Sequence, residues 1–404
     1  MEPSGEGEGR SRRKRETIWS LPFAILMAVN LFQSMAAFMA NTTLPVLADA
    51  MGANAAMVGV MVSSFTVSSL IIRPFAGPAF DSFSRKALLL ASQATIAFSL
   101  FLYGVVDSFG FLIAVRLLHG VGIGCSGPLA MSLVSEYLPP SKFASGISIY
   151  ALAQSFAQVV GPAAGLYLVG AVGFSASYSL ASASVLAAMV GVLFIREPAR
   201  ERLPYQLKPS RMFAREAVGK AAALMLLSAS FSCMGAYAVL YGYERGVAQM
   251  GLFFVVYSLC LLVTRPVLGN LADRLGTPRV LLMGMAFFAA SYIALSQADD
   301  LGGFLLAAVI GSAGFGCCGP LLQSLALASV PIERRGAASN TAFTGLDLGM
   351  LWGPLAGGGV AQVLAGPLGS QAEAYSVMWL VMLVPIAVAL VPVLHWGLKR
   401  RRRG

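Results

Sequence analysis

Ionisable side chains within long apolar stretches are the residues of this sequence that most directly suggest chemistry. Arg116, His119 and Asp347 each interrupt such a stretch, and a charge inside a bilayer must face a partner or a polar cavity. Asp347 lies well inside its stretch, where a carboxylate can carry a proton or neutralise a cationic substrate, and we predict one of these roles. The alternatives are structural: an aspartate that holds helices together, or an arginine that binds backbone carbonyls.

Neutral polar residues in neighbouring apolar runs are candidates for a substrate cavity around Asp347. Gln154 and Gln158 lie one helical turn apart, while Tyr241 and Tyr257 supply hydroxyl groups. Apolar and aromatic walls with few polar groups suit amphipathic small molecules. The alternative for each of these residues is a hydrogen bond between two helices. The predicted cavity residues are Asn30, Gln33, Asn41, Gln154, Gln158, Tyr241, Tyr257, Gln323 and Trp352.

The sequence shows no pattern typical of an enzyme, a metal site or a bound cofactor, and we expect none of these. All five cysteines lie in apolar runs without metal-ligand spacing, which favours a packing role. His119 and His395 have no neighbours in sequence that would complete a cluster. The glycine-rich segment 120–124 lies within an apolar run rather than after a strand, so close helix packing is favoured over nucleotide binding. An ATP-driven pump is therefore disfavoured.

Long membrane-spanning helices are needed to position these residues. With 57% hydrophobic and 11% charged residues, the 404-residue chain has too little polar surface for a soluble body. Continuous apolar runs of about 20 residues predict twelve transmembrane helices and exclude the short alternating strands of a barrel. The predicted spans are 18–40, 55–76, 87–106, 110–134, 143–168 and 173–195, followed by 217–242, 248–268, 280–298, 302–328, 337–364 and 374–397. The predicted fold class is an all-α integral membrane protein.

An internal repeat with a constant separation of 192 residues divides these helices into two sets. The stretch 73–81 recurs at 265–273, and Gly161-Pro162 recurs as Gly353-Pro354. Because the separation between the repeated stretches stays constant over a long part of the sequence, the repeat indicates duplication. We therefore predict two pseudo-symmetric six-helix bundles at 18–195 and 217–397, a cytoplasmic linker at 196–216 and basic tails at 1–17 and 398–404.

Basic residues mark one side of the predicted membrane protein. They gather in both tails, around Asp81 and Asp273 and in the segment 196–220, whereas acidic residues such as Asp107 and Glu373 predominate in the other loops. Because cytoplasmic loops carry an excess of Lys and Arg, both termini are predicted to be cytoplasmic. The net charge of +10 is then explained by topology and anionic lipid rather than by nucleic acid. The expected location is the inner (plasma) membrane of a bacterium.

The basic loops of the two halves carry a recognisable motif. Residues 77–86 and 269–279 resemble the pattern Gly-x-x-x-Asp-Arg-x-Gly-Arg-Lys between helices two and three of the major facilitator superfamily, although Ser82 and Ser84 depart from it. The resemblance extends from about 18 to 397 and implies the fold of that superfamily. It also implies a cytoplasmic latch that stabilises an outward-facing state; the alternative is a set of loop caps. The predicted latch residues are Gly77, Asp81, Arg85, Lys86, Gly269, Asp273, Arg274 and Gly276.

Two further motifs resemble those of the twelve-helix drug:proton antiporters in this superfamily, the group similar to arabinose-efflux permeases. Residues 116–122 are similar to Arg-x-x-Gln-Gly-x-Gly, with His119 in place of Gln. The resemblance implies that Arg116 acts in proton coupling, the role also considered above for Asp347, and His119 adds a titratable group. The fifth and eleventh spans resemble the Gly-x-x-x-Gly-Pro-x-x-Gly-Gly motif, whose small residues and proline suit a tight, bent helix contact. Its residues here are Gly161, Pro162, Gly165, Gly349, Gly353, Pro354 and Gly357.

Together these patterns favour a secondary active transporter that exports small amphipathic organic molecules in exchange for protons by alternating access. Proton-coupled uptake of a metabolite such as a carboxylate or sugar is the alternative, and it would require Arg116 to contact the substrate. An intramembrane enzyme or a sensor is disfavoured, because no polar catalytic cluster and no extra soluble domain is visible. The expected partners are a small-molecule substrate, protons and membrane lipids, and the resemblance favours a monomer.

Overall fold

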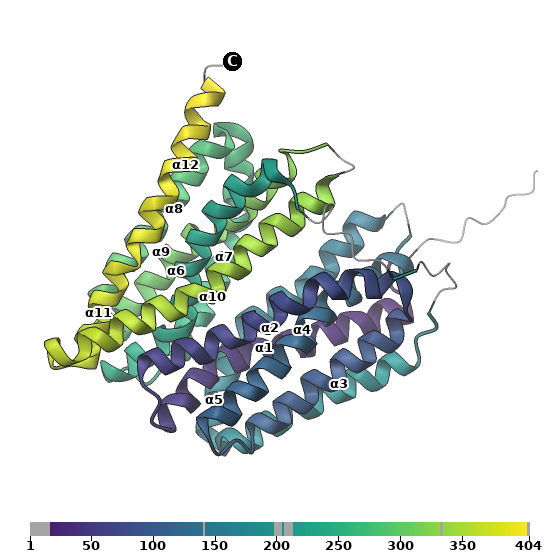
Figure 1. Cartoon of the computed structure of the whole chain (residues 1–404), viewed down its shortest axis with the longest axis horizontal. Helices are drawn as coiled ribbons and strands as arrows, with labels where there is room; N and C mark the ends of the chain where they lie inside the picture. The colour runs from purple at the N-terminus through teal and green to yellow at the C-terminus, as the bar shows by residue number, and fades with distance from the viewer. Residues whose placement is uncertain (1–16, 140–141, 198–203, 206–212, 332–333, 402–404) are drawn as a thin grey trace, which may run out of the picture.

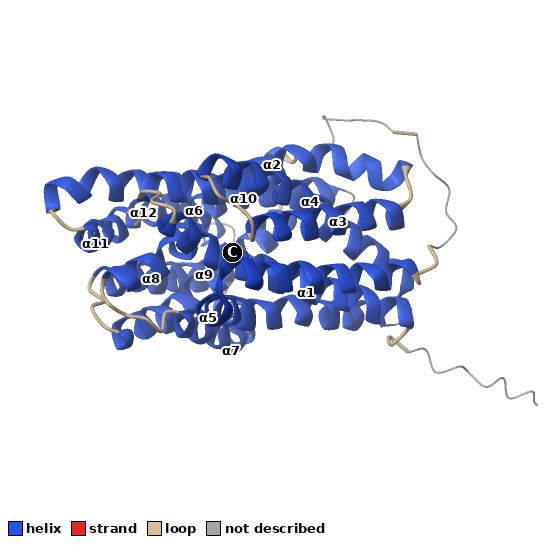
Figure 2. Ribbon diagram, turned by 90° about the horizontal axis from the view of Figure 1, so that it is seen from below, coloured by secondary structure: helices blue, strands red, loops and turns tan. Residues whose placement is uncertain are grey.

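The described part of the chain consists of helices and the short turns between them (Figure 2). The computed structural model describes residues 17–139, 142–197, 204–205, 213–331 and 334–401; most of the predicted linker, most of the N-terminal tail and the last three residues lie outside them. The first half contains α1 (Leu21–Ala50), α2 (Ala55–Ser82), α3 (Arg85–Tyr103), α4 (Phe109–Tyr137) and α5 (Phe143–Leu193). The second half contains η3 (Arg215–Ala217), α6 (Val218–Glu244), α7 (Gly251–Leu275), α8 (Thr277–Ser296), α9 (Leu301–Leu327), α10 (Arg335–Leu368), α11 (Gln371–Val381) and α12 (Leu383–Arg401).

Polar side chains explain where many of these helices begin. Asn54 Oδ1 accepts a hydrogen bond from the backbone N–H of Met57 at 2.9 Å, and Asp300 Oδ1 accepts one from Gly303 at 2.8 Å. Such caps satisfy backbone donors that have no partner within the helix. Each cap stands where a short polar turn meets a long apolar run, so these boundaries are encoded locally. Serines cap four further helices in the same way: Ser20, Ser84, Ser108 and Ser370.

The observed helices differ from the predicted spans most clearly in three places. The first helix continues to Ala50 rather than ending at 40, because polar residues within it are satisfied: Thr43 Oγ1 donates to the carbonyl of Met39 at 2.9 Å. The predicted spans 143–168 and 173–195 both lie in α5, which turns at Gly173, where φ is 79° and favours glycine. The predicted span 374–397 is divided into α11 and α12 near Met382.

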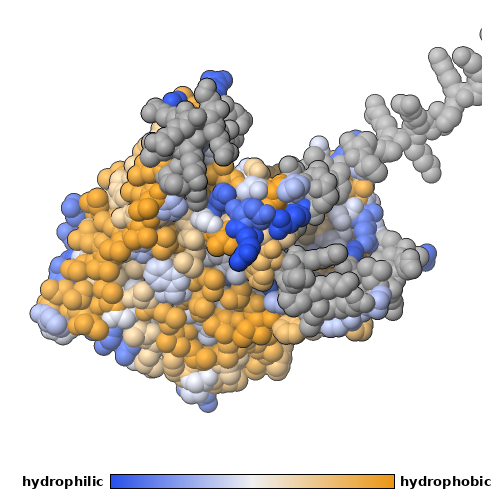
Figure 3. All heavy atoms as spheres, turned by 45° about the horizontal axis from the view of Figure 1, so that its top comes forward, coloured by the Kyte–Doolittle hydropathy of each residue, from blue (hydrophilic) through white to orange (hydrophobic). Residues whose placement is uncertain are grey.

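The surface has the character expected of a membrane protein. Among the described residues, ten helices are long and apolar enough to cross a membrane, and α7 adds the shorter apolar segment Gly251–Thr264. One of the ten, Ser145–Leu193, has 49 residues, which suffices for two crossings of about 20 residues each. Figure 3 shows hydrophobic residues over most of the visible flank. These observations agree with the twelve predicted crossings.

The helices form two bundles that meet along two interfaces. Within the first half α1 packs on α5 and α2 on α4; within the second half α6 packs on α10 and α7 on α9. Between the halves α2 packs on α10, and α5 packs on α7. The 192-residue repeat relates these two interfaces, because it places α2 on α7 and α5 on α10.

One end of each bundle is basic and the other is acidic. The basic end carries Arg85, Lys86 and Arg334, and the acidic end carries Asp299 and Glu373. In Figure 1 the two bundles lie close together near the start of α2 and the end of α10, at the acidic end. They diverge toward the basic end, where the C-terminus lies. The structure therefore has its halves joined mainly at the acidic end.

Candidate functional site

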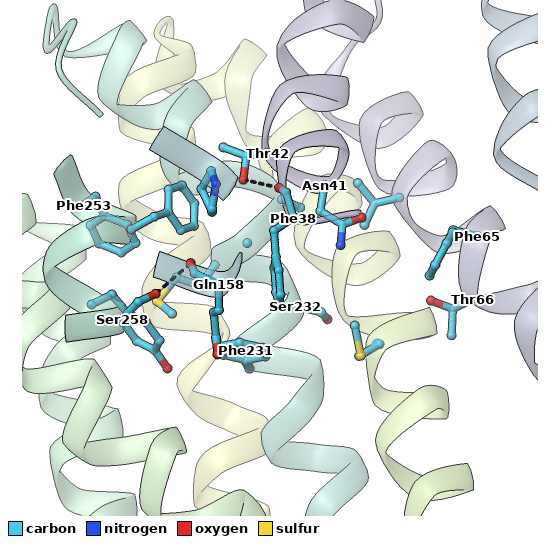
Figure 4. A pocket seen from close by; sticks show the side chains of 18 of the residues that line it. Phe38, Asn41, Thr42, Phe65, Thr66, Gln158, Phe231, Ser232, Phe253 and Ser258 are labelled. Atoms are coloured by element: carbon cyan, nitrogen blue, oxygen red, sulfur yellow. Dashed lines mark hydrogen bonds between the residues drawn. The ribbon is translucent and has the colours of Figure 1, made fainter. Parts of the chain in front are cut away.

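A cavity lies between the two halves, with walls from α1, α2, α4 and α5 on one side and from α6, α7 and α10 on the other (Figure 4). Most of its lining is apolar or aromatic, and its one charged side chain, among the lining residues that the structure describes, is Arg116. Such a wall suits an organic molecule with a large apolar part. The aromatic lining residues are Phe38, Phe65, Phe231, Phe253, Phe254 and Tyr257.

Three of the predicted cavity residues line this space. Asn41 lies on α1, Gln158 on α5 and Tyr257 on α7, so they come from both halves. Figure 4 shows the amides of Asn41 and Gln158 among the aromatic rings of Phe38 and Phe231. The backbone carbonyl of Gln158 also accepts a hydrogen bond from Ser258 at 3.0 Å, which links α5 to α7.

The other predicted cavity residues lie elsewhere. Three of them use their polar atoms within one half: Asn30 donates to the carbonyl of Tyr150 at 3.1 Å, Gln33 accepts from Gln93 at 2.5 Å, and Tyr241 shares a 2.9 Å hydrogen bond with Ser376. These contacts are the helix-to-helix bonds considered as the alternative. Gln154, Gln323 and Trp352 are not among the residues that line the cavity.

Arg116 is buried at the wall of the cavity and forms no ion pair with a carboxylate of the described residues. It is 1% exposed, its Nη2 donates to Asn41 Oδ1 at 2.8 Å, and its guanidinium carbon lies 4.6 Å from the centre of the Phe65 ring. Its Nε and Nη1 have no hydrogen-bond partner among the described residues. The neighbours that interact with this positive charge, among the described residues, are a neutral amide, the Tyr103 hydroxyl and an aromatic face.

His119 lies one turn along α4 from Arg116 and is fully buried. Its Nδ1 and the hydroxyl of Tyr103 are 3.1 Å apart, while Nε2 has no partner among the described residues. The ring packs edge-on against Phe65, the same residue that covers Arg116. His119 thus lies behind the cavity wall and is not one of the residues lining the cavity.

Asp347 forms an ion pair with Arg73, and the pair connects α10 of one half to α2 of the other. The aspartate side chain is 7% exposed, whereas that of Arg73 is 34% exposed, so solvent reaches the pair from the arginine side. Arg73 was not among the predicted site residues. The signal that could have identified it is the repeat, since Arg73 opens the first repeated stretch.

The predicted latch is described only in part. Arg85 pairs with Glu136 on α4, its backbone N–H donates to Glu197 at 2.8 Å, and Lys86 donates to the carbonyl of Leu193 at 2.7 Å. Glu136 and Leu193 belong to the first half, and Glu197 lies at the start of the predicted linker. In the second copy Arg274 is exposed, and Gly276 has φ of 87°, which favours glycine between α7 and α8. The side chains of Asp81 and Asp273, and the surroundings of Gly77 and Gly269, lie outside what the structure describes.

The glycines of the predicted packing motif lie where α5 meets α1 and where α10 meets α6. A Cβ at Gly165 would come within 2.6 Å of Met39, and one at Gly353 within 2.1 Å of the backbone oxygen of Ala229. Only glycine permits helices to approach this closely. Gly161 contacts α1 in the same manner, and Gly349 and Gly357 contact α6, while Pro162 and Pro354 lie inside their helices.

Contacts between the halves continue along α2 toward the acidic end. The Tyr237 hydroxyl on α6 lies 2.9 Å from the carbonyl oxygens of both Ala55 on α2 and Pro354 on α10. Ser63 on α2 donates to the carbonyl of Leu351 on α10 at 2.5 Å. These contacts join three helices next to the acidic end, and the pair between Arg73 and Asp347 lies further toward the basic end.

Sequence comparison relates the chain to transport proteins. The family model described as the Major Facilitator Superfamily matches residues 26–248 and 221–404. The chain is 26% identical over 368 residues to the multidrug resistance protein MdtG of Enterobacter lignolyticus, covering 86% of this chain and 83% of that protein. It is 24% identical over 310 residues to the class G tetracycline resistance protein of Vibrio anguillarum, covering 74% and 78%.

Solved structures share the fold at low sequence identity. The nucleoside transporter NupG superposes with a TM-score of 0.78 at 12% identity, covering 93% of this chain and 99% of that one. A bacterial homolog of the human lysosomal transporter Spinster, in an inward-facing and unoccupied conformation, gives a TM-score of 0.77 at 13% identity, with 92% and 95% covered. At this level of identity the likeness concerns the fold.

Proposed function

This chain belongs to the Major Facilitator Superfamily and is a multi-pass membrane transporter of small molecules, and we propose that it exports amphipathic organic compounds in exchange for protons. The observation that carries the proposal is the largely apolar cavity between two repeat-related halves. In alternating access, two such halves rock around a central site and expose it to one side of the membrane at a time.

The arrangement of the halves supports this cycle. Tyr237, Ala55 and Pro354 hold the acidic end together while the bundles diverge toward the basic end. We assign the basic end to the cytoplasm because of the excess of Lys and Arg in its loops. The structure then corresponds to an inward-facing state, from which an exporter takes up its substrate. The proposed location is the inner membrane of a bacterium, with a monomer as the transporting unit.

Asp347 is the proposed proton carrier, with Arg73 as its partner. The ion pair with Arg73 requires the carboxylate form of Asp347, and it joins the two halves in the state that opens to the cytoplasm. Protonation removes the charge on Asp347 and with it the ion pair between the halves. The protonation state of one residue thereby changes the relative energies of the two arrangements. Arg116 and His119 would affect coupling through the substrate cavity rather than as carriers.

The relatives support export as the direction of transport. The multidrug and tetracycline resistance proteins support export, and the apolar cavity wall is compatible with such compounds. The second candidate is uptake of a small metabolite, and the position of Arg116 at the cavity wall is the observation that favours it. The two functions predict opposite effects of expression on the cellular content of a substrate.

The test measures accumulation of lipophilic dyes and antibiotics in efflux-deficient bacteria that express the chain, with and without a protonophore. Lower accumulation that returns to the level of empty-vector cells when the protonophore is added is the expected result. Raised accumulation that requires the proton gradient would support uptake instead. Equal accumulation in expressing and empty-vector cells across a broad panel would contradict the proposed export.

A further inference from the structure

The charge of the cavity wall is the starting point. Of the lining residues that the structure describes, Arg116 alone is charged, and no aspartate or glutamate is among them. Asp347 is not a lining residue, and its charge is already balanced by Arg73. A cationic compound in this cavity would therefore meet a buried positive charge and no available carboxylate.

The positive charge of Arg116 is incompletely compensated by the protein. Its Nη2 donates to the neutral amide of Asn41, the nearby Tyr103 hydroxyl is also uncharged, and Nε and Nη1 have no hydrogen-bond partner among the described residues. A buried guanidinium is normally paired with a carboxylate or with several acceptors, because leaving its charge unbalanced in a medium of low dielectric is costly. The missing negative charge points to a ligand that supplies it.

Asn41 connects this charge to the cavity. Because Oδ1 accepts the hydrogen bond from Arg116, the amide nitrogen must face the other way, and Figure 4 shows it in the space between Phe38 and Phe65. No hydrogen bond of this nitrogen occurs within the described residues, so its N–H groups are available to a ligand. The hydrogen bond from a cation to the amide oxygen also polarises the amide and strengthens its N–H groups as donors.

Aromatic rings surround this donor group. Phe38 and Phe65 flank Asn41, and Phe231, Phe253 and Phe254 line the cavity from the other half. A ligand that places an acidic group at Asn41 would thus lay an apolar body against rings from both halves. The site combines one anion-attracting position with an extended apolar wall.

We infer that the central cavity selects amphipathic organic anions, whose acidic group binds the amide nitrogen of Asn41 with the charge of Arg116 behind it. The inference rests on the proposed function only in taking this cavity as the substrate site. It uses neither the direction of transport nor proton coupling. It narrows the substrates to compounds such as aromatic carboxylates or sulfonates and disfavours lipophilic cations.

Three probes of matched shape and different charge test the inference: naphthylacetate, naphthylacetamide and naphthylethylammonium. Their binding to the purified full chain in detergent is measured by equilibrium dialysis at neutral pH. The anion is expected to bind at least about tenfold more tightly than the neutral amide, since a hydrogen bond to a charged group contributes more than a neutral one. The cation is expected to bind most weakly.

Two variants test whether Asn41 and Arg116 cause the preference for the anion. Asn41→Asp places a carboxylate beside Arg116 and should abolish the preference for the anion, and Arg116→Gln should do the same by removing the charge. Gln249→Leu, at an exposed residue that does not line the cavity, should keep the preference. Equal or tighter binding of the cation by the wild type would overturn the inference. So would failure of all three probes to bind the folded protein, or a preference that survives in both charge variants.

The binding experiment and the export assay can fail independently, so they test the anion site and the proposed function separately. Proton-dependent export of neutral or cationic compounds, without a charge preference in dialysis, would overturn the anion site and leave the exporter intact. A clear preference for the anion without any proton-dependent export would support the anion site and contradict the proposed exporter.

Discussion

Asp347 and Arg73 pair across the α2–α10 interface, so a carboxylate of one half binds a guanidinium of the other. Each belongs to a helix of a different half, and the pair can exist only while α2 and α10 keep their present relative position. A group that gains or loses a proton at this position acts directly on the contact between the halves.

Replacement of Asp347 by Asn should abolish proton-linked transport while the protein remains folded. The amide has the same shape but cannot exchange a proton, so substrate movement and proton movement are no longer coupled. The measurement is substrate-driven proton flux in proteoliposomes. Asp107→Asn, at an exposed acid of the acidic end, should behave as the wild type. Normal proton flux in a well-folded Asp347→Asn variant would rule out the carrier role.

Replacement of Arg73 by Gln should impair transport in a similar way and should also lower stability. It leaves Asp347 without its partner in an apolar setting, at a cost of about 1–3 kcal/mol; the partial exposure of Arg73 reduces the effect of a fully buried pair. The check is the thermal unfolding midpoint together with transport. The exchanged pair Arg73→Asp with Asp347→Arg should recover part of the lost stability. An exchange no more stable than either single variant would argue against a direct ion pair.

Tyr237→Phe should loosen the acidic end. The change removes the hydroxyl that contacts both Ala55 and Pro354, and loss of about 1 kcal/mol should shift the population toward the outward-open state by roughly fivefold. Distances between spin labels at Ala50 and Leu368, two exposed positions of that end, would report the shift in a background without native cysteines. The matched change Tyr243→Phe, at a partly exposed residue of the same helix, should leave the distances unaltered.

Gly353→Ala should destabilise the packing of α10 on α6. The new Cβ at position 353 would lie 2.1 Å from the backbone oxygen of Ala229, so α6 and α10 must separate. We expect this to lower the free energy of unfolding by about 1–3 kcal/mol. Gly359→Ala on the same helix meets no atom within 4 Å and should change stability by less than about 0.5 kcal/mol. Thermal unfolding in detergent compares the two. Similar midpoints for both variants would show that the helix contact tolerates a methyl group.

The predicted fold follows from features that are local in sequence. Apolar length, capping residues such as Asn54 and Asp300, and the 192-residue repeat together indicate twelve spans in two bundles. One difference between the predicted and observed helices lies at polar residues that do not end a helix. Thr43 lies beyond the predicted first span, yet its hydroxyl bonds to Met39 and Tyr178, so the helix continues through it.

The candidate site was less accessible to prediction, because it depends on which side of each helix faces the cavity. Asn41 and Gln158 line the cavity, whereas Gln33 is tied to Gln93 within the first half. Aromatic walls were expected, but the phenylalanines that form them could not be identified, because a phenylalanine such as Phe65 looks the same in sequence whether it faces lipid or a cavity. The pairing of Arg73 with Asp347 joins positions 274 residues apart, and no local pattern reports such a distance.

The two interfaces between the halves have the same ancestry but not the same chemistry. The repeat relates Arg73 to Arg265 and Asp347 to Ser155, so the α5–α7 interface has a hydroxyl where the α2–α10 interface has a carboxylate. A serine does not ionise near neutral pH, and no proton can change the charge at that position. If Asp347 carries the proton, as proposed, acidification changes the charge at this position of α10 and leaves its repeat partner on α5 uncharged. The expected effect of acid is then confined to the side of the molecule where α2 meets α10.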